Sequence, residues 1–142
     1  MATQGNINSK IIGRGVLFPI QLSTNDKGES GWYPVDGDRK LIVNNVNAIL
    51  LYMLGERFRQ EDFGSRLWEC IEEPNTQAQA FLINTFLKEA LSNWEDRISY
   101  DHAEVTREAT KVHIKLFYKL LQLDQTSSLN ITYDNLTNTL TQ

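Results

Sequence analysis

Cysteine is almost absent from this sequence of 142 residues, which contains only Cys70. A single cysteine excludes an internal disulfide, and one cysteine with two scattered histidines does not form a zinc site. We therefore expect no metal and no cofactor. Cys70 itself is interpreted as a small, partly buried apolar side chain.

Long apolar runs and an excess of positive charge are missing too. The longest apolar run covers residues 48–54, whereas a membrane-spanning helix needs about 20 apolar residues. The first ten residues, MATQGNINSK, lack the apolar segment of a signal peptide. The formal net charge of -4 provides no positive field for phosphate backbones. We expect a protein made in the cytoplasm that binds neither nucleic acid nor a membrane.

The composition is that of a globular protein. Apolar residues make up 41% and charged residues 23%, which excludes a disordered chain of high net charge and low hydrophobicity. The length fits a single domain over residues 1–142. Residues 1–13 are polar and lack periodicity, so they are predicted to form an extended N-terminal arm.

The first third of the sequence predicts short strands followed by a helix. A β-prone run over residues 16–22 is interrupted by Pro19, and Asn25 to Gly28 has the composition of a turn before a second extended segment over residues 32–35. Asp38 is a candidate N-cap for a helix over residues 39–54. Gly55 then occupies the position of a C-terminal glycine in the left-handed conformation.

Two further helices and a β-meander complete the predicted fold. A short helix over residues 65–71 precedes Pro74, and a long helix, capped by Asn75 or Thr76, runs to Trp94. The apolar period then changes to two, first over residues 98–105 and then over 112–120 and 129–133. The sequence predicts an α+β fold with two or three helices on one face of a mixed or antiparallel sheet. The strands and tail of residues 111–142 follow the long helix.

No pattern in the sequence is specific for an enzyme. The central carboxylates could supply the two acids of a glycosidase, but no cluster of aromatic residues around them forms a saccharide platform. Capping and solubility explain them better, so we expect no catalytic residues. The carboxylates concerned are Glu56, Glu61, Asp62, Glu69, Glu72 and Glu73.

Three short motifs mix charge, glycine and aromatic residues at the ends of predicted helices. They are Gly55-Glu56-Arg57, Asp62-Phe63-Gly64-Ser65 and Trp94-Glu95-Asp96-Arg97-Ile98, with the pair Glu73-Pro74 in between. In this order and spacing, over about residues 12–98, the chain resembles the baseplate wedge family of contractile tails. That family includes sheath-initiator proteins of phages and the corresponding subunits of type VI secretion and extracellular injection systems.

The resemblance implies that Trp94, Glu95, Asp96 and Arg97 dock onto the wedge scaffold. The family turn usually reads Trp-Glu-Pro-Arg-Ile, and Asp96 here replaces the proline, which leaves the turn less preorganised. Gly55, Glu56, Arg57, Phe63 and Gly64 match the structural motif at the helix exit. The alternative for the turn is a self-contained cap in which Glu95 pairs with Arg97 and Trp94 lies in the core.

The resemblance also implies that the C-terminal sheet templates sheath polymerisation, because arms of the sheath subunits add to its edge as extra strands. An ordinary hairpin that closes its own sheet is an equal alternative for any single strand. The implied partners are other wedge subunits and sheath subunits, with tube or hub proteins as further candidates. The implied location is the tail baseplate of a phage or a related injection apparatus, after synthesis in the bacterial cytoplasm. The residues expected to form the sheath-binding strands are Val112, Ile114, Leu116, Tyr118, Leu129, Ile131 and Tyr133.

Two other functions stay open at this point. One is a peptidoglycan-cleaving, lysozyme-like tail enzyme that uses the central carboxylates. The other is a free-standing cytoplasmic adaptor of the same fold.

Overall fold

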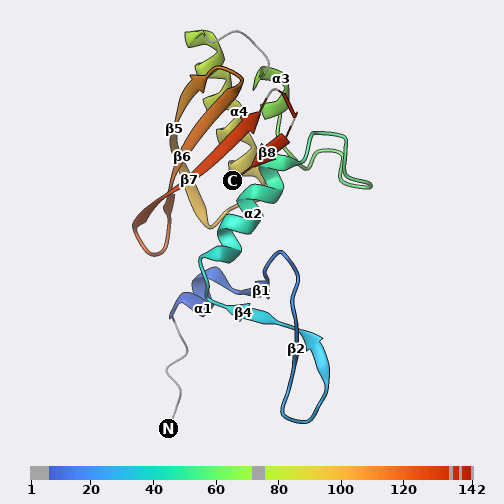
Figure 1. The fold of residues 1–142 in the computed structure, drawn as a ribbon. Helices are drawn as coiled ribbons and strands as arrows, with labels where there is room; N and C mark the ends of the chain where they lie inside the picture. Colours follow the sequence, from blue (N-terminus) through green and yellow to red (C-terminus); the bar gives the residue numbers. More distant parts are fainter. Residues whose placement is uncertain (1–6, 72–75, 135, 138, 142) are drawn as a thin grey trace. The chain divides into compact units, whose positions relative to one another are not determined.

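The computed structural model describes residues 7–71, 76–134, 136–137 and 139–141 (Figure 1). The chain groups into two compact units, Met1–Val46 and Asn47–Gln142, and the division falls within a helix. The predicted single domain over residues 1–142 stays a prediction. The Glu73-Pro74 pair and Asn75 lie outside the described residues.

The first unit begins with helix α1 (Ile7–Ile12). Strand β1 (Arg14–Val16) pairs antiparallel with β4 (Pro34–Asp36), and β2 (Leu22–Thr24) pairs antiparallel with β3 (Ser30–Trp32). The prediction of an extended arm is wrong for residues 7–12, where Ile12 is 3% exposed and burial of its side chain favours the helical segment. Residues 1–6 of the predicted arm lie outside the described part.

A tight turn joins β2 to β3, as the sequence predicts. The Asn25 side-chain oxygen accepts hydrogen bonds from the amides of Lys27 and Glu29, and the Gly28 amide donates to the Asn25 carbonyl. The run over residues 16–22 does not form one strand. It is divided around Pro19, which has no amide to donate to a strand ladder.

Helix α2 (Lys40–Leu51) starts as predicted, because the Asp38 carboxylate accepts from the Lys40 amide at 2.9 Å. It ends three residues before the predicted Leu54. The carbonyls of its last turn are taken by a later segment: Ser65 Oγ donates to Leu50, Trp68 Nε1 donates to Leu51, and the Ser65 amide donates to Tyr52. These donors satisfy carbonyls that have no partner within the helix.

Helices α3 (Leu67–Ile71) and α4 (Gln77–Trp94) belong to the second unit. Thr76 is the N-cap of α4, and its hydroxyl accepts from the Gln79 amide at 3.2 Å. The buried Gln79 side chain donates to the carbonyls of Cys70 and Ile71, so it joins the start of α4 to the end of α3. The predicted apolar stripe of α4 is buried at Ile83, Leu87, Ala90 and Leu91.

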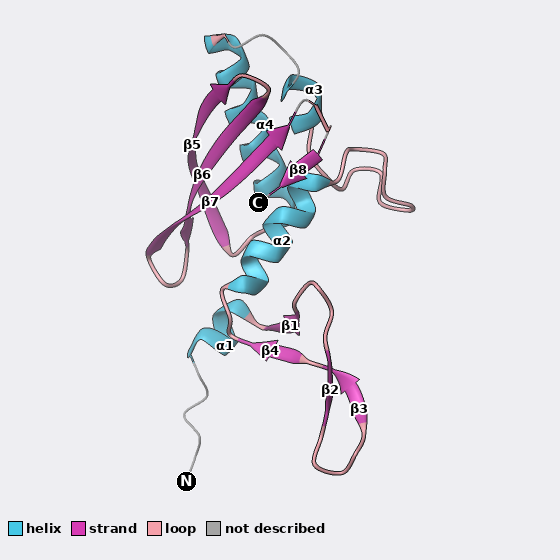
Figure 2. Ribbon diagram, in the orientation of Figure 1, coloured by secondary structure: helices cyan, strands magenta, loops and turns pink. Residues whose placement is uncertain are grey.

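The sheet of the second unit contains β5 (Ile98–Glu108), β6 (Lys111–Leu120), β7 (Gln125–Asp134) and β8 (Thr139–Thr141), hydrogen-bonded in that order. Neighbouring strands are antiparallel, and the register shifts on β5 between Tyr100 and His102. One face of the sheet is buried against helices (Figure 2), as the edge-to-face contact of Trp68 on α3 with Tyr133 on β7 illustrates. The predicted α+β class and the C-terminal meander after the long helix are confirmed.

The helices of the described part are too short or too polar for crossing a membrane.

Candidate partner-binding site at the end of the long helix

The turn between α4 and β5 contains the residues expected to dock on a partner. Glu95 follows the last residue of α4, and its amide donates to the Leu91 carbonyl at 2.9 Å. The Glu95 side chain is only 2% exposed, whereas Asp96 is exposed and the Arg97 side chain is 23% exposed. The turn therefore buries its first carboxylate and leaves Asp96 and part of Arg97 at the surface.

The Arg97 guanidinium makes a two-pronged contact with the Glu95 carboxylate. Arg97 Nε and Nη2 donate to Glu95 Oε1 and Oε2, each at 2.5 Å, and the Arg97 amide donates to Oε1 at 3.3 Å. This hydrogen bonding raises the pKa of Arg97 above its ordinary value, so the guanidinium stays charged. The self-contained pair weighed from the sequence is thus present in the isolated chain. Docking through the exposed part of Arg97 stays a prediction.

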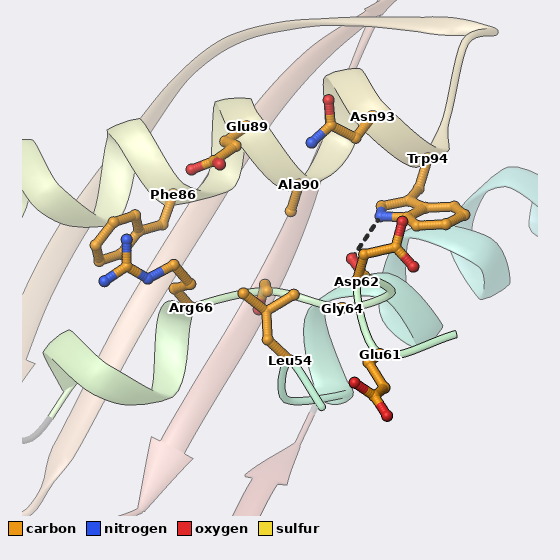
Figure 3. A pocket seen from close by; sticks show the side chains of 11 residues that line it. Leu54, Glu61, Asp62, Gly64, Arg66, Phe86, Glu89, Ala90, Asn93 and Trp94 are labelled. Atoms are coloured by element: carbon orange, nitrogen blue, oxygen red, sulfur yellow. Dashed lines mark hydrogen bonds between the residues drawn. The ribbon is translucent and has the colours of Figure 1, made fainter. Parts of the chain in front are cut away.

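Aromatic contacts bring together the three motifs that the sequence analysis treated separately. The Phe63 ring packs edge to face on Trp94, with centroids 5.0 Å apart, and on Tyr52 at 5.7 Å. The Arg57 guanidinium lies over the Phe63 ring, 4.6 Å from its centroid. Trp94 Nε1 donates to the Asp62 carbonyl at 3.3 Å (Figure 3). Phe63 is therefore the buried anchor that connects the loop after α2 to the turn after α4.

Glycine at position 64 is required by a close backbone approach. Gly64 has φ of +125°, and a Cβ atom there would lie 2.5 Å from the Tyr52 carbonyl oxygen. Gly55 also has a positive φ, +84°, but no heavy atom lies within 4 Å of its Cβ position. Its amide donates to the Glu61 carbonyl at 2.7 Å, so Gly55 closes the base of a loop. Because α2 ends at Leu51, Gly55 does not directly follow that helix.

We expect Gly64→Ala to lower the free energy of unfolding by about 3 kcal/mol or more, because it adds a backbone clash to the strain of positive φ. Gly55→Ala is the matched control and should cost about 1 kcal/mol, the cost of the left-handed conformation alone. Urea denaturation of both variants measures the difference. Equal costs would contradict the close approach at Gly64.

A cavity of about 230 Å³ lies between α4 and the segment that carries Phe63 (Figure 3). The side chains of Glu89, Asn93 and Trp94 come from α4, and those of Glu61 and Asp62 come from the facing segment. The other central carboxylates have structural contacts: Glu56 accepts from the Met53 amide, and Glu69 pairs with Arg66 at 2.8 Å. Glu72 and Glu73 lie outside the described residues. Of the acids considered for catalysis, only Glu61 and Asp62 line this cavity among the described ones.

The residues that mark the predicted sheath-binding strands all have side chains in the core, so an added strand would meet the backbone of these strands and not these side chains. Their exposed fractions range from 0% to 6%. Four of them belong to β6, which is paired on both sides by β5 and β7 and has no open edge. The prediction is therefore corrected for Val112, Ile114, Leu116 and Tyr118. For Leu129, Ile131 and Tyr133 on β7, addition of a sheath strand stays a prediction.

Strand β7 has an open edge over its first half. The Leu121 amide donates to the Arg97 carbonyl, so the odd-numbered backbone groups of β6 point toward β5 and the even-numbered ones toward β7. Since Leu116 lies opposite Leu129, the backbone groups of Thr126, Ser128 and Asn130 point away from β6. The described residues of β8 pair with residues 132–134, and no other described strand covers residues 126–130.

The opposite edge of the sheet, on β5, is partly occupied by a side chain. Asn84 on α4 accepts from the Ala103 amide at 2.9 Å and donates to the Ala103 carbonyl at 3.3 Å. It also accepts from the Tyr100 hydroxyl, and burial, followed by the charge of Asp101, raises the pKa of Tyr100 to about 12. A strand adding to β5 would have to displace Asn84, so β7 is the more accessible edge.

Comparison with known proteins shows the family. The model of the baseplate wedge protein gp25 family matches residues 36–125, which is more than half of the chain. The chain belongs to the gp25 baseplate wedge family. The resemblance found in the sequence motifs is thereby confirmed.

Two solved structures have a similar fold. A chain in the six-fold symmetrised baseplate of the anti-feeding prophage is 18% identical, with a TM-score of 0.68 over 81% of this chain and 90% of that one. A Geobacter sulfurreducens protein described as a candidate tail lysozyme is 26% identical, with a TM-score of 0.59 over 66% of this chain and 86% of that one. No curated protein matches significantly.

Two features of this gp25-family chain were missed by the sequence analysis. Asn84 was not singled out, although it is a polar residue beside the apolar stripe of α4. Phe58 was not singled out either, although it is an aromatic residue between two arginines. Within the described part of the chain, no group of three or more histidine, cysteine, aspartate or glutamate side chains is placed to hold a metal ion.

Proposed function

We propose that this chain is a structural component of a contractile-tail baseplate wedge that also templates the sheath. Membership of the baseplate wedge family is the observation that supports the baseplate role most strongly. The similar fold of a chain in the anti-feeding prophage baseplate is consistent with it. The protein is made in the bacterial cytoplasm and incorporated into a phage tail or a related injection apparatus.

The turn of residues 94–97 is the proposed contact with the other wedge subunits. It combines an exposed Asp96 with an Arg97 guanidinium whose position is fixed by the buried Glu95. A planar guanidinium fixed in this way loses little conformational entropy when a partner carboxylate or carbonyl approaches its exposed edge.

The open edge of β7 is the proposed template for the sheath. Thr126, Ser128 and Asn130 present backbone donors and acceptors in a row, and their exposed side chains are polar or small. An extended arm of a sheath subunit can continue the sheet there through main-chain hydrogen bonds. The partners are therefore other wedge subunits and sheath subunits, with tube or hub proteins as further neighbours in the same baseplate.

The experiment that tests this role compares particles from cells that carry the gene with particles from cells that lack it. We expect the chain in purified baseplates, and we expect its loss to abolish sheathed tails in electron micrographs. Sheathed tails of normal number and length in its absence would contradict the proposal.

The alternative function is cleavage of peptidoglycan. It is favoured by the cavity lined by Glu61 and Asp62 and by the likeness to a candidate tail lysozyme. Two carboxylates at suitable separation are the minimum that such hydrolysis requires.

We expect the purified chain to show no muramidase activity above that of the Glu61→Gln and Asp62→Asn variants, because the proposed role is structural. Release of soluble fragments from purified peptidoglycan is the measurement. Turnover by the wild-type chain that is lost in either variant would establish the enzymatic alternative.

A further inference from the structure

The loop of residues 55–61, called the 55–61 loop below, carries the most exposed large apolar side chain of the described residues. Phe58 is 85% exposed, and every residue of the loop is exposed. In Figure 1 the loop extends outward between α2 and α3. A phenylalanine in this position contributes nothing to the core. Its exposure forgoes the stabilisation of about 2 kcal/mol that burial of the same side chain would give.

Hydrogen bonds hold the base of the loop in one conformation. The Gly55 amide donates to the Glu61 carbonyl at 2.7 Å, which closes the two ends on each other. Within the loop the Gln60 amide donates to the Arg57 carbonyl at 3.2 Å, and the Phe63 amide donates to the Gln60 carbonyl at 3.0 Å. The Glu56 carboxylate accepts from the Met53 amide at 2.9 Å. The loop is thus a short projection with a fixed base.

The Arg57 side chain connects this projection to the core. Its guanidinium lies 4.6 Å from the centroid of Phe63, which is 9% exposed and packs on Trp94. A stacked guanidinium of this kind loses part of its freedom before any partner arrives. The position of the projection is therefore fixed by the same aromatic cluster that joins the three sequence motifs.

The tip of the loop is positively charged. Arg59 lies with its guanidinium 5.3 Å from the centroid of Phe58, and Arg57 is on the other side of Phe58 in sequence. No salt bridge joins Arg57 or Arg59 to another described residue. The nearby Glu56 carboxylate accepts from the Met53 amide, and the Glu61 backbone closes the base of the loop. The tip, residues 57–60, has two positive side chains and no negative one.

We propose that the 55–61 loop is a docking anchor: Phe58 inserts into an apolar pocket of another baseplate subunit, and Arg57 and Arg59 pair with carboxylates around that pocket. This inference rests on the proposed function, because the occupant is a subunit of the same baseplate. Aromatic and arginine side chains carry most of the free energy at protein interfaces. Charge complementarity selects an acidic rim, because two unpaired guanidiniums repel a basic surface and gain most from carboxylates.

The experiment measures binding of the full-length chain to the other purified wedge subunits encoded in the same gene cluster. We expect Phe58→Ala to weaken this binding by about tenfold or more, the usual effect of removing an interface anchor. Phe81→Ala is the matched control, because Phe81 is also largely exposed, at 70%, but lies on α4. The control should bind like the wild-type chain.

Charge reversal tests the acidic rim separately. Arg59→Glu should weaken binding more at low salt than at high salt, because screening reduces both the lost attraction and the new repulsion. Lys27→Glu, at an exposed position in the β2–β3 turn, makes the same charge change and should have a smaller effect. Arg57 is left intact in this comparison because it stacks on Phe63.

The outcomes of the binding experiment distinguish the anchor from the proposed function. Wild-type binding that is unchanged in Phe58→Ala overturns the anchor and leaves the proposed function standing. A wild-type chain that does not bind the wedge subunits at all overturns both. Self-association of the wild-type chain that is lost in Phe58→Ala, seen by sedimentation, would make a second copy the occupant and would also overturn the proposal.

Discussion

Ser128→Pro is expected to leave this protein folded and to prevent growth of the sheath. The Ser128 amide points away from β6 and has no described strand opposite it, so its loss breaks no bond between β6 and β7. Proline restricts the residue before it to extended conformations, and the residue before position 128 already lies in a strand. The proline ring at position 128 would, however, occupy the space of an added strand. The missing amide would also remove one main-chain hydrogen bond to that strand.

The effect on the sheath should be large, because strand addition depends on an uninterrupted row of backbone groups. We expect the number of full-length sheaths on purified particles to fall about tenfold or more, since a lost hydrogen bond and a steric block together exceed about 1.4 kcal/mol. Electron microscopy of particles that carry the variant gives this count.

Ser128→Ala is the matched control for this variant. It removes the same hydroxyl but keeps the backbone amide, so sheaths should grow normally. The melting temperatures of both variants should lie close to that of the wild-type chain. Full-length sheaths on Ser128→Pro baseplates would show that the open edge of β7 is not the template.

Arg97→Ala is expected to lower the free energy of unfolding by about 3 kcal/mol, because it leaves the buried Glu95 carboxylate without its ion pair. Loss of assembly in this variant would therefore mix two causes, a weaker fold and a missing contact.

Arg97→Lys separates these causes. Lysine keeps a positive charge beside Glu95 but cannot reproduce the planar fork. If Arg97 docks on the wedge scaffold, the lysine variant should stay folded and still bind the other wedge subunits about tenfold more weakly, a loss typical of an interface arginine. Urea denaturation and a binding titration are the two measurements.

The outcome that would contradict docking is also definite. If Arg97→Lys binds the wedge subunits as tightly as the wild-type chain, the pair of Glu95 and Arg97 is a self-contained cap. The role of the turn would then be to fix the junction of α4 and β5.

Local patterns in the sequence predicted the elements of the fold well. Asp38 and Thr76 mark the starts of α2 and α4, and Asn25 marks the turn between β2 and β3, because each cap or turn depends on residues within a few positions. The end of α2 was missed because its last carbonyls are bound by Ser65 and Trp68, which come much later in the chain.

The candidate site was less predictable because alternation along a strand identifies the buried face but not the open edge. Leu116 and Leu129 show the same period of two, yet β6 is paired on both sides and β7 is open over half its length. Which edge of the sheet stays open depends on how far β8 extends along β7 and on the contact of Asn84 with β5. Both are tertiary contacts, which cannot be predicted from local patterns in a single sequence.

The most direct test of the proposed role is a cryo-electron microscopy map of the assembled baseplate. The map should show this chain in the wedge, with Arg97 facing another wedge subunit and a strand from a sheath subunit beside residues 126–130 of β7. A baseplate that lacks the chain, or one in which the edge of β7 stays open while sheath subunits attach elsewhere, would contradict the account.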